Sequence, residues 1–268
     1  MTRLDTSRGP SAARNSWTLG ADRADLRRPA REPQVLHVEA APQSLTLDLA
    51  RTAVVVVDMQ NDFCHPDGWL AGIGVDVTPA RAPIPVLADL LPALRGHDVP
   101  VVWVSWGNRP DQANLPPNVL HVYDPDGTGA GIGSPNNAAG SPVLEAGSWA
   151  AAVVDELSGA PGFADDLHVD KYRMSGFVDT PLDSVLRNLR VDTLLLAGVN
   201  ADQCVLATLM DAANIGYDVV MLEDAVATTS PTFCIEATVY NVRQCFGFTA
   251  LASDLLAALQ PAPRKTAP

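Results

Sequence analysis

The clearest candidate for chemistry is Cys204, within the run GVNADQCVLAT at 198–208. An apolar run, TLLLAG, leads into this stretch, and a helical pattern of apolar residues follows it. If Asp202 caps that helix, Cys204 lies in the first turn, where free N–H groups and the helix dipole favour a thiolate. Residues 199–204 also supply amide hydrogens at a tight bend, which suits a developing oxyanion. The pattern predicts a nucleophile; the alternative is a buried structural cysteine, the commoner fate of a single Cys.

Asp58 and Lys171 are the side chains that could assist such a nucleophile. Asp58 ends the run TAVVVVD and is either a general base or a strand-end acid that caps the next turn. Burial there raises the pKa of Asp58 unless a cation faces it. Lys171 is the candidate cation: among 18 basic residues only Lys171 and Lys265 are lysines, and a buried lysine changes its pKa more readily than an arginine. The alternative is that Lys171 is a chance survivor of a codon bias towards arginine.

Strands that alternate with helices must position these residues. The predicted strands are 52–58, 99–106, 167–171, 192–199, 217–224 and 248–252, and the predicted helices are 79–96, 148–157, 180–190 (capped by Thr180), 202–216 and 230–247 (capped by Ser230). This order predicts an α/β fold with a doubly wound, mainly parallel six-stranded sheet and helices on both faces. In such sheets ligands bind outside the carboxyl ends of the strands, near the point where strand order reverses. Asp58, Lys171 and the bend before Cys204 are therefore expected at one edge.

Composition and charge favour a cytoplasmic globular protein that binds neither nucleic acid nor membranes. The formal net charge is −13, which disfavours nucleic acid and anionic membranes as partners. The apolar runs are far too short to cross a bilayer, and the four cysteines form no CxxC pair that would indicate disulfide stapling. We expect an N-terminal arm at 1–45 that is largely disordered or extended, one domain at 46–258 and a flexible tail at 259–268.

Three stretches together resemble the isochorismatase-like cysteine hydrolases: VVVVDMQNDF, VDKYRMSGFVDTPLDSVL and AGVNADQCVLAT. The resemblance covers about residues 46–258. That family includes nicotinamidases, N-carbamoylsarcosine amidohydrolases, biuret hydrolases and ureidoacrylate amidohydrolases, and the SGF…TPLDS run makes the ureidoacrylate branch the most similar. The resemblance implies a Rossmann-like sheet, a homodimer or homotetramer, and a small amide or ureido substrate.

The resemblance also implies roles for individual residues. Cys204 would attack the substrate carbonyl to form a thioester, Asp58 would carry the thiol proton to the leaving nitrogen, and Lys171 would tune both by its charge. In the family a non-proline cis peptide precedes the nucleophile, and here it would join Val199 to Asn200. The N–H groups of Asn200 and Cys204 would then form the oxyanion hole.

Some features depart from the family pattern or shape the pocket. The DxH motif of metal-binding nicotinamidases is absent from SWGNRPDQ, and the five histidines have no ligand spacing, so we expect no metal and no cofactor.

Met174 stands where ureidoacrylate enzymes have an aromatic. Long loop 107–148 is expected to be functional or mobile, and together with Arg173 it suggests a pocket that closes over a compact anionic substrate. The candidate substrate-binding residues are Phe63, Trp106, Asn108, Tyr172 and Arg173, although Trp106 and Tyr172 are also suited to ordinary packing.

Three functions remain open from the sequence. The first is hydrolysis of a C–N bond in a small linear amide, carbamoyl or ureido compound. The second is the opening of a cyclic amide, as the resemblance to streptothricin hydrolases within the family allows. The third is a catalytically silent scaffold that binds a metabolite. The presence of Asp58, Lys171 and Cys204 together favours an enzyme, because a scaffold needs none of these groups.

Overall fold

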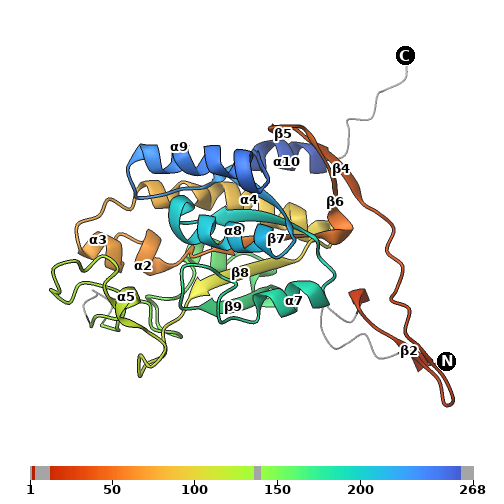
Figure 1. Cartoon of the computed structure of the whole chain (residues 1–268), viewed down its shortest axis with the longest axis horizontal. Helices are drawn as coiled ribbons and strands as arrows, with labels where there is room; N and C mark the ends of the chain where they lie inside the picture. The colour runs from red at the N-terminus through yellow and green to blue at the C-terminus, as the bar shows by residue number, and fades with distance from the viewer. Residues whose placement is uncertain (1, 4–12, 136–139, 261–268) are drawn as a thin grey trace.

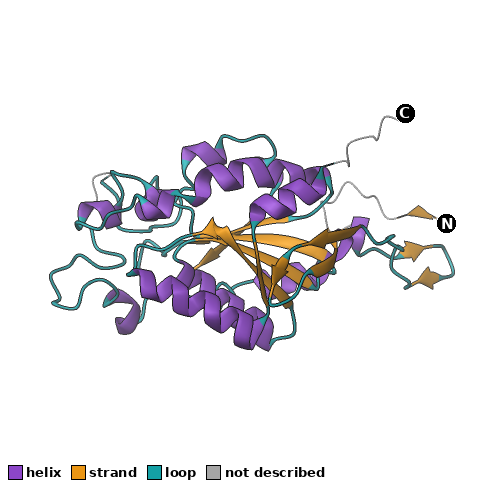
Figure 2. Ribbon diagram, turned by 90° about the horizontal axis from the view of Figure 1, so that it is seen from above, coloured by secondary structure: helices purple, strands orange, loops and turns teal. Residues whose placement is uncertain are grey.

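The fold is a sheet between two layers of helices. It is seen in a computed structural model that describes residues 2–3, 13–135 and 140–260. Figure 2 shows the sheet nearly edge-on with helices on both faces. Within the described part of the chain, no helix is long and apolar enough to cross a membrane.

All six predicted strands are present, and each pairs in parallel with its neighbours. They are β7 (Thr52–Val57), β8 (Val101–Trp106), β9 (Leu167–Lys171), β10 (Thr193–Gly198), β11 (Asp218–Val226) and β12 (Phe248–Ala250). A seventh strand, β5 (Ala40–Ala41), adds to the edge antiparallel to β12. Two residues are too few to show the alternation that identifies a strand in a sequence, which is why the predicted sheet had six strands.

The strand order places the reversal point beside Asp58 and Cys204. The order is β5-β12-β11-β10-β7-β8-β9, so the chain builds outward from β7 to β9 and then returns to the other side of β7. β7 and β10 are therefore the central pair, and the crevice at their carboxyl ends is the position where such sheets bind ligands. Gly198 at the end of β10 has φ +107°, and a Cβ there would lie 2.0 Å from Val57 O. Only glycine permits this close approach.

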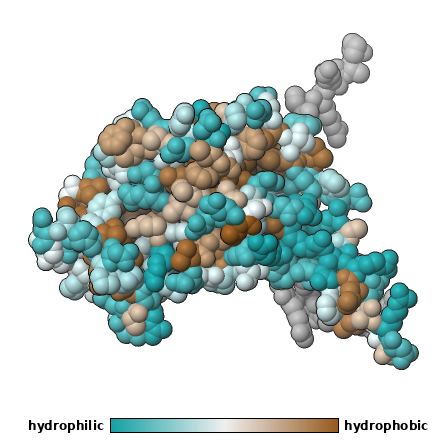
Figure 3. Space-filling view, viewed as in Figure 1, coloured by the Kyte–Doolittle hydropathy of each residue, from teal (hydrophilic) through white to brown (hydrophobic). Residues whose placement is uncertain are grey.

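Helices α4 (Pro83–Gly96) and α10 (Ala252–Leu259) pack against each other and the sheet, and α8 (Leu206–Asn214) packs against β11. Other α-helices in the described residues are α2 (Asn61–Cys64), α3 (Trp69–Gly72), α5 (Pro117–Leu120), α6 (Asp155–Ser158), α7 (Leu182–Asn188) and α9 (Thr232–Asn241). Figure 3 shows apolar residues gathered on the surface over α9, which carries the exposed side chains of Phe233 and Tyr240.

The helix predicted at 148–157 and the cap predicted at Ser230 differ from the structure. The helix expected at 148–157 shrinks to α6, because the carbonyls of Ala150 and Ala152 accept hydrogen bonds from the amides of Asp62 and Asn61. This pairing with a distant segment replaces the local helical bonds. Ser230 does not cap α9, which has no side-chain cap; its hydroxyl instead accepts a hydrogen bond from Gln203 Nε2 at 3.2 Å.

The N-terminal arm is extended and runs along one side of the molecule (Figure 1). β2 (Thr18–Leu19) pairs with both β1 (Thr2–Arg3) and β3 (Ala24–Asp25), and β4 (Val35–Val38) pairs with β6 (Leu45–Asp48). The β4–β6 pair spans the boundary that was expected near residue 46. The division into arm, domain and tail stays a prediction, as does the oligomeric state, and tail residues 261–268 lie outside the described residues.

Candidate active site

Asp58 is the first residue after β7 and is 1% exposed. Its amide donates to Val104 O at 2.9 Å, which ties it to the end of β8. The residue has φ +51°, a left-handed conformation that aspartate tolerates better than most side chains. The chain turns sharply away from the sheet here and leaves the carboxylate at the crevice between β7 and β10.

Lys171 is the last residue of β9 and is fully buried. β8 lies between β9 and β7, so the two strands are about 10 Å apart and only a long side chain can join them. Lys171 Nζ lies 2.7 Å from Asp58 Oδ2 and 3.4 Å from Cys204 Sγ. It also donates to Arg173 O at 3.2 Å and lies 4.1 Å from the ring centre of Trp106. The ammonium therefore connects the other two predicted catalytic residues.

Cys204 is 5% exposed and lies in a π-helical turn, Ala201–Val205, that leads into α8. The predicted capping role of Asp202 is wrong: Asn200 occupies the N-cap position, and no side chain caps this helix. The Asp202 carboxylate instead accepts a hydrogen bond from the Thr228 hydroxyl. A tertiary partner on the loop after β11 thus replaces the local cap.

The protonation of the site also differs from expectation. Burial raises the pKa of Cys204; Lys171 opposes this effect and Asp58 adds to it. Cys204 is therefore a thiol at rest, whereas its position near a helix start predicted a thiolate. Burial likewise raises the pKa of Asp58, and Lys171 lowers it. The arrangement places a carboxylate that can accept a proton beside a thiol that must lose one in order to attack.

This protonation predicts the order in which the cysteines react. We expect iodoacetamide at pH 8 to modify exposed Cys245 at least about tenfold faster than Cys204, because a thiol reacts far more slowly than a thiolate and burial limits access. Peptide mapping by mass spectrometry, with activity followed in parallel, gives both rates. Cys64 should also react slowly, because it is fully buried and burial raises its pKa to about 12. Faster modification of Cys204 than of Cys245 would show that the free enzyme holds a thiolate.

The backbone amides on either side of Cys204 are hydrogen-bonded to the residue before the turn. The Val199–Asn200 peptide bond is cis, at the position that the family resemblance implied. The amides of Gln203 and Val205 both donate to Asn200 O, at 3.0 and 3.2 Å, and the amide of Ala201 donates to Ala227 O at 2.8 Å. The Cys204 amide lies between two groups that share a single carbonyl.

A pocket of about 400 Å³ opens beside the nucleophile candidate. Met174 lines it and lies with its Sδ 3.7 Å from Cys204 Sγ. Gln203 Nε2 donates to Tyr123 Oη at 3.3 Å, which joins long loop 107–148 to the turn that carries Cys204. The lining residues are Val122, Tyr123, Met174, Gln203 and Ala207, and the pocket wall is mainly apolar.

Three of the predicted substrate-binding residues are buried and do not line the pocket. Trp106 is 1% exposed, with its ring against the Lys171 ammonium, and its indole N–H donates to Asn108 Oδ1 at 2.7 Å. Asn108 is also buried and donates to Val143 O at 2.9 Å. Phe63 is 6% exposed and packs edge-on against Trp69. In this structure Trp106 and Asn108 support the lysine, and Phe63 belongs to the core.

Tyr172 and Arg173 are engaged outside the pocket. Arg173 Nη1 donates to Asn114 O and Tyr172 O, both at 2.8 Å, and Nη2 lies 3.5 Å from Asp179. Tyr172 Oη donates to Asp179 O at 3.0 Å. The guanidinium that suggested an anionic substrate is thus committed to the protein's own carbonyls and a carboxylate.

Sequence reasoning missed most of the pocket lining, although part of it carried a signal. Gln203 directly precedes Cys204, and Ala207 follows it by about one helical turn, so both were in reach of a local argument. Tyr123 and Val122 lie in an irregular loop, where no periodicity marks the residues that face a site. Within the described residues, no group of three or more His, Cys, Asp or Glu side chains could hold a metal ion.

Comparison with protein-family models and curated proteins gives consistent matches. The model described as the isochorismatase domain matches residues 52–254. The ureidoacrylate amidohydrolase RutB of Rhizobium rhizogenes is 35% identical over 252 residues, which cover 89% of this chain and 96% of that protein. The ureidoacrylate amidohydrolase RutB of Agrobacterium fabrum is 36% identical over 240 residues, with coverage of 85% and 98%.

Solved structures give the same picture of the fold. A cysteine hydrolase from Pseudomonas syringae pv. phaseolicola 1448A superposes with a TM-score of 0.65 and 26% identity, covering 80% of this chain and 94% of that chain. The N-carbamoylsarcosine amidase of Thermoplasma acidophilum gives a TM-score of 0.56 and 25% identity, with coverage of 75% and 96%.

Proposed function

The chain belongs to the isochorismatase family, and from that premise we propose that it is a cysteine-dependent hydrolase that cleaves a C–N bond in a small amide, carbamoyl or ureido compound. The observation that carries the proposal is the contact of Lys171 Nζ with both Asp58 Oδ2 and Cys204 Sγ, at 2.7 and 3.4 Å. The names of relatives support the substrate class, since they include ureidoacrylate amidohydrolases and an N-carbamoylsarcosine amidase.

The first chemical step is attack of Cys204 on the substrate carbonyl. The sulfur forms a bond to the carbonyl carbon while its proton passes to the Asp58 carboxylate, which burial makes a stronger base than an exposed aspartate. The carbonyl oxygen gains negative charge, and the amides of Asn200 and Cys204 are the donors proposed to stabilise it. The C–N bond then breaks, and Asp58 gives its proton to the departing nitrogen.

The second step is hydrolysis of the thioester. Asp58 is a carboxylate again after the amine leaves, so it can take a proton from an attacking water molecule. Collapse of the new tetrahedral intermediate releases the acid product and returns the proton to Cys204. Lys171 lowers the pKa of Asp58 and so favours its ionised form in a buried site where a lone carboxylate would become neutral.

The activity test is a panel of amides, ureas and lactams that is followed by ammonia release and by product mass. A linear ureido or carbamoyl compound should give stoichiometric ammonia, and the Cys204→Ala protein serves as the blank. Turnover confined to a lactam, with a gain of one water and no ammonia, would replace the proposed substrate class with a cyclic amide. A panel without any turnover by the wild-type protein contradicts the hydrolase assignment.

We further propose that the substrate part lying in the pocket is uncharged. The described lining residues include no cation, and Arg173 is bound elsewhere. A carboxylate in a mainly apolar pocket without a cationic partner is unfavourable. This replaces the anionic substrate that Arg173 suggested from the sequence alone.

Substrate charge can be tested with a matched pair of ureas. We expect kcat/KM for propylurea to exceed that for 3-ureidopropionate at least about tenfold, a difference of about 1.4 kcal/mol. The two differ by a methyl group in place of a carboxylate. Gln203→Lys should shift the preference towards the acid, and Gln203→Met controls for loss of the amide. Preference of the wild-type protein for the acid would refute the uncharged substrate and leave the hydrolase assignment intact.

A further inference from the structure

A second cavity, of about 620 Å³, lies at the opposite edge of the sheet from Cys204. It is bounded by Val101 and Leu167, which begin β8 and β9, whereas Lys171 ends β9 at the candidate active site. The other lining residues come from the N-terminal arm (Ala13, Arg14, Arg31), the last turn of α4 and the segment after it (Arg95, Asp98, Val99, Pro100) and the turn before β9 (Gly162, Asp165, Asp166). The cavity therefore lies between the arm and the body of the domain.

Arg14 fixes the arm to the body without the help of a carboxylate. It is 4% exposed, and its guanidinium donates to Ala50 O at 3.1 Å and to Asp98 O. Both acceptors are neutral carbonyl groups, and no ion pair of Arg14 occurs within the described residues. The charge on this buried guanidinium is hydrogen-bonded but not neutralised.

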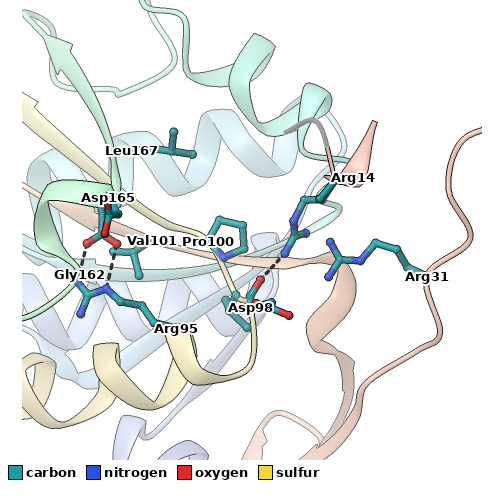
Figure 4. Close-up of a pocket in the computed structure, with 12 residues that line it drawn as sticks. Arg14, Arg31, Arg95, Asp98, Pro100, Val101, Gly162, Asp165 and Leu167 are labelled. Atoms are coloured by element: carbon teal, nitrogen blue, oxygen red, sulfur yellow. Dashed lines mark hydrogen bonds and ion pairs between the residues drawn. The ribbon is translucent and has the colours of Figure 1, made fainter. Parts of the chain in front are cut away.

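Arg31 adds a second positive charge to the same space. Figure 4 shows the Arg14 and Arg31 guanidinium groups approaching each other above Asp98. Arg31 is partly buried and makes no hydrogen bond or ion pair with the described part of the chain. Burial and then the charge of Arg31 lower the pKa of Arg14 to about 10, and the opposing effect of Asp98 is smaller. Because arginine side chains carry a positive charge in proteins, the two guanidinium groups repel each other.

Arg95 shows how an arginine of the same wall is neutralised. Its Nε and Nη2 contact the two oxygens of Asp166 at 2.9 and 2.5 Å, and Asp166 also accepts from Trp103 Nε1 at 2.8 Å. This is a paired structural arginine. Arg14 and Arg31 have no equivalent carboxylate, although the exposed acids Asp98 and Asp165 stand at the rim.

We propose that Arg14 and Arg31 form a binding site for a small oxyanion, a carboxylate or a phosphate, that fastens the N-terminal arm to the domain. An oxyanion between the two guanidinium groups replaces a repulsion with two charge-assisted attractions, and the planar forks of arginine suit its geometry. The rim acids restrict the ligand to a compact anion that fits between the arginines. The site is independent of the proposed hydrolase activity.

Calorimetric titration of the full chain with inorganic phosphate, and separately with succinate, tests the site. Chloride at matched ionic strength controls for screening. We expect saturable binding of at least one oxyanion, and Arg31→Gln should weaken it at least about tenfold, because one of two charge-assisted contacts is lost. Arg31 makes no contact that holds the arm, so this substitution leaves the arm docked through Arg14.

Arg23→Gln is the matched control, since Arg23 lies on the same arm, is exposed and does not line the cavity. It should bind the oxyanion as the wild-type protein does, and so should Cys204→Ala, which excludes binding at the candidate active site.

The oxyanion should also protect the arm from limited proteolysis in the wild-type protein but not in Arg31→Gln. Binding of phosphate alone identifies a phosphate site, and binding of succinate alone a carboxylate site. The proposal is overturned if the wild-type protein shows no saturable binding of either oxyanion. It is also overturned if Arg31→Gln binds as tightly as the wild-type protein, or if Arg23→Gln loses as much affinity as Arg31→Gln.

Discussion

Replacement of Cys204 by alanine is expected to lower kcat at least about 10⁴-fold, because it removes the sulfur that we propose forms the covalent intermediate. The fold should persist, since alanine suits a helix start and the change removes only a sulfur that contacts Lys171 and Met174. Steady-state kinetics on a turned-over urea or amide gives the rate, and thermal unfolding checks the fold.

Cys64→Ala is the matched control for this experiment. Cys64 is fully buried, and its sulfur donates to Ala80 O at 3.6 Å. Both substitutions delete one buried sulfur, so a stability loss affects both, whereas the rate should fall only for Cys204→Ala. Mass spectrometry of the quenched wild-type enzyme should reveal an acyl adduct on Cys204. A Cys204→Ala protein that keeps activity within tenfold of wild type would rule out nucleophilic catalysis by this residue.

Lys171→Met is expected to reduce both turnover and stability. It leaves the Asp58 carboxylate buried without its cation, and loss of one partner of a buried ion pair costs about 3–5 kcal/mol in the free energy of unfolding. Turnover should fall at least about 10³-fold, because the members of a catalytic triad act as a unit. Lys171 lowers the pKa of Asp58, so its removal raises that pKa. The acidic limb of the kcat/KM profile, where Asp58 must be ionised, should therefore shift to higher pH.

The double variant Asp58→Asn with Lys171→Met separates stability from catalysis. It removes both charges, so no uncompensated ion remains in the core, and most of the lost stability should return. Turnover should stay as low as in the single variant. Chemical denaturation of the wild-type protein, both single variants and the double variant gives the coupling energy between the two side chains. A double variant less stable than Lys171→Met, or an acidic limb that does not move, contradicts this account of the pair.

The local sequence was sufficient to predict the strands and the edge on which the catalytic candidates lie. The run TAVVVVD predicts a strand buried on both faces, and all residues of β7 are buried. Asp58 and Lys171 follow from the same argument, because a residue at the carboxyl end of a parallel strand lies at the ligand-binding edge whatever the rest of the fold. The bend at Gly198 was readable too, since it interrupts an apolar run directly before a helical pattern.

Tertiary structure alone decided the protonation of the site, the direction of its side chains and the pocket wall. The helix-start argument predicted a thiolate at Cys204, but burial raises its pKa, and the opposing charge of Lys171 is a smaller effect. Arg173 follows Lys171 by two residues, yet carbonyls and an aspartate hold it away from the pocket. Tyr123 lines the pocket from an irregular loop and reaches Gln203 across 80 positions of sequence. Periodicity and local propensity describe neighbours along the chain, whereas desolvation and hydrogen bonding depend on which distant segments pack together.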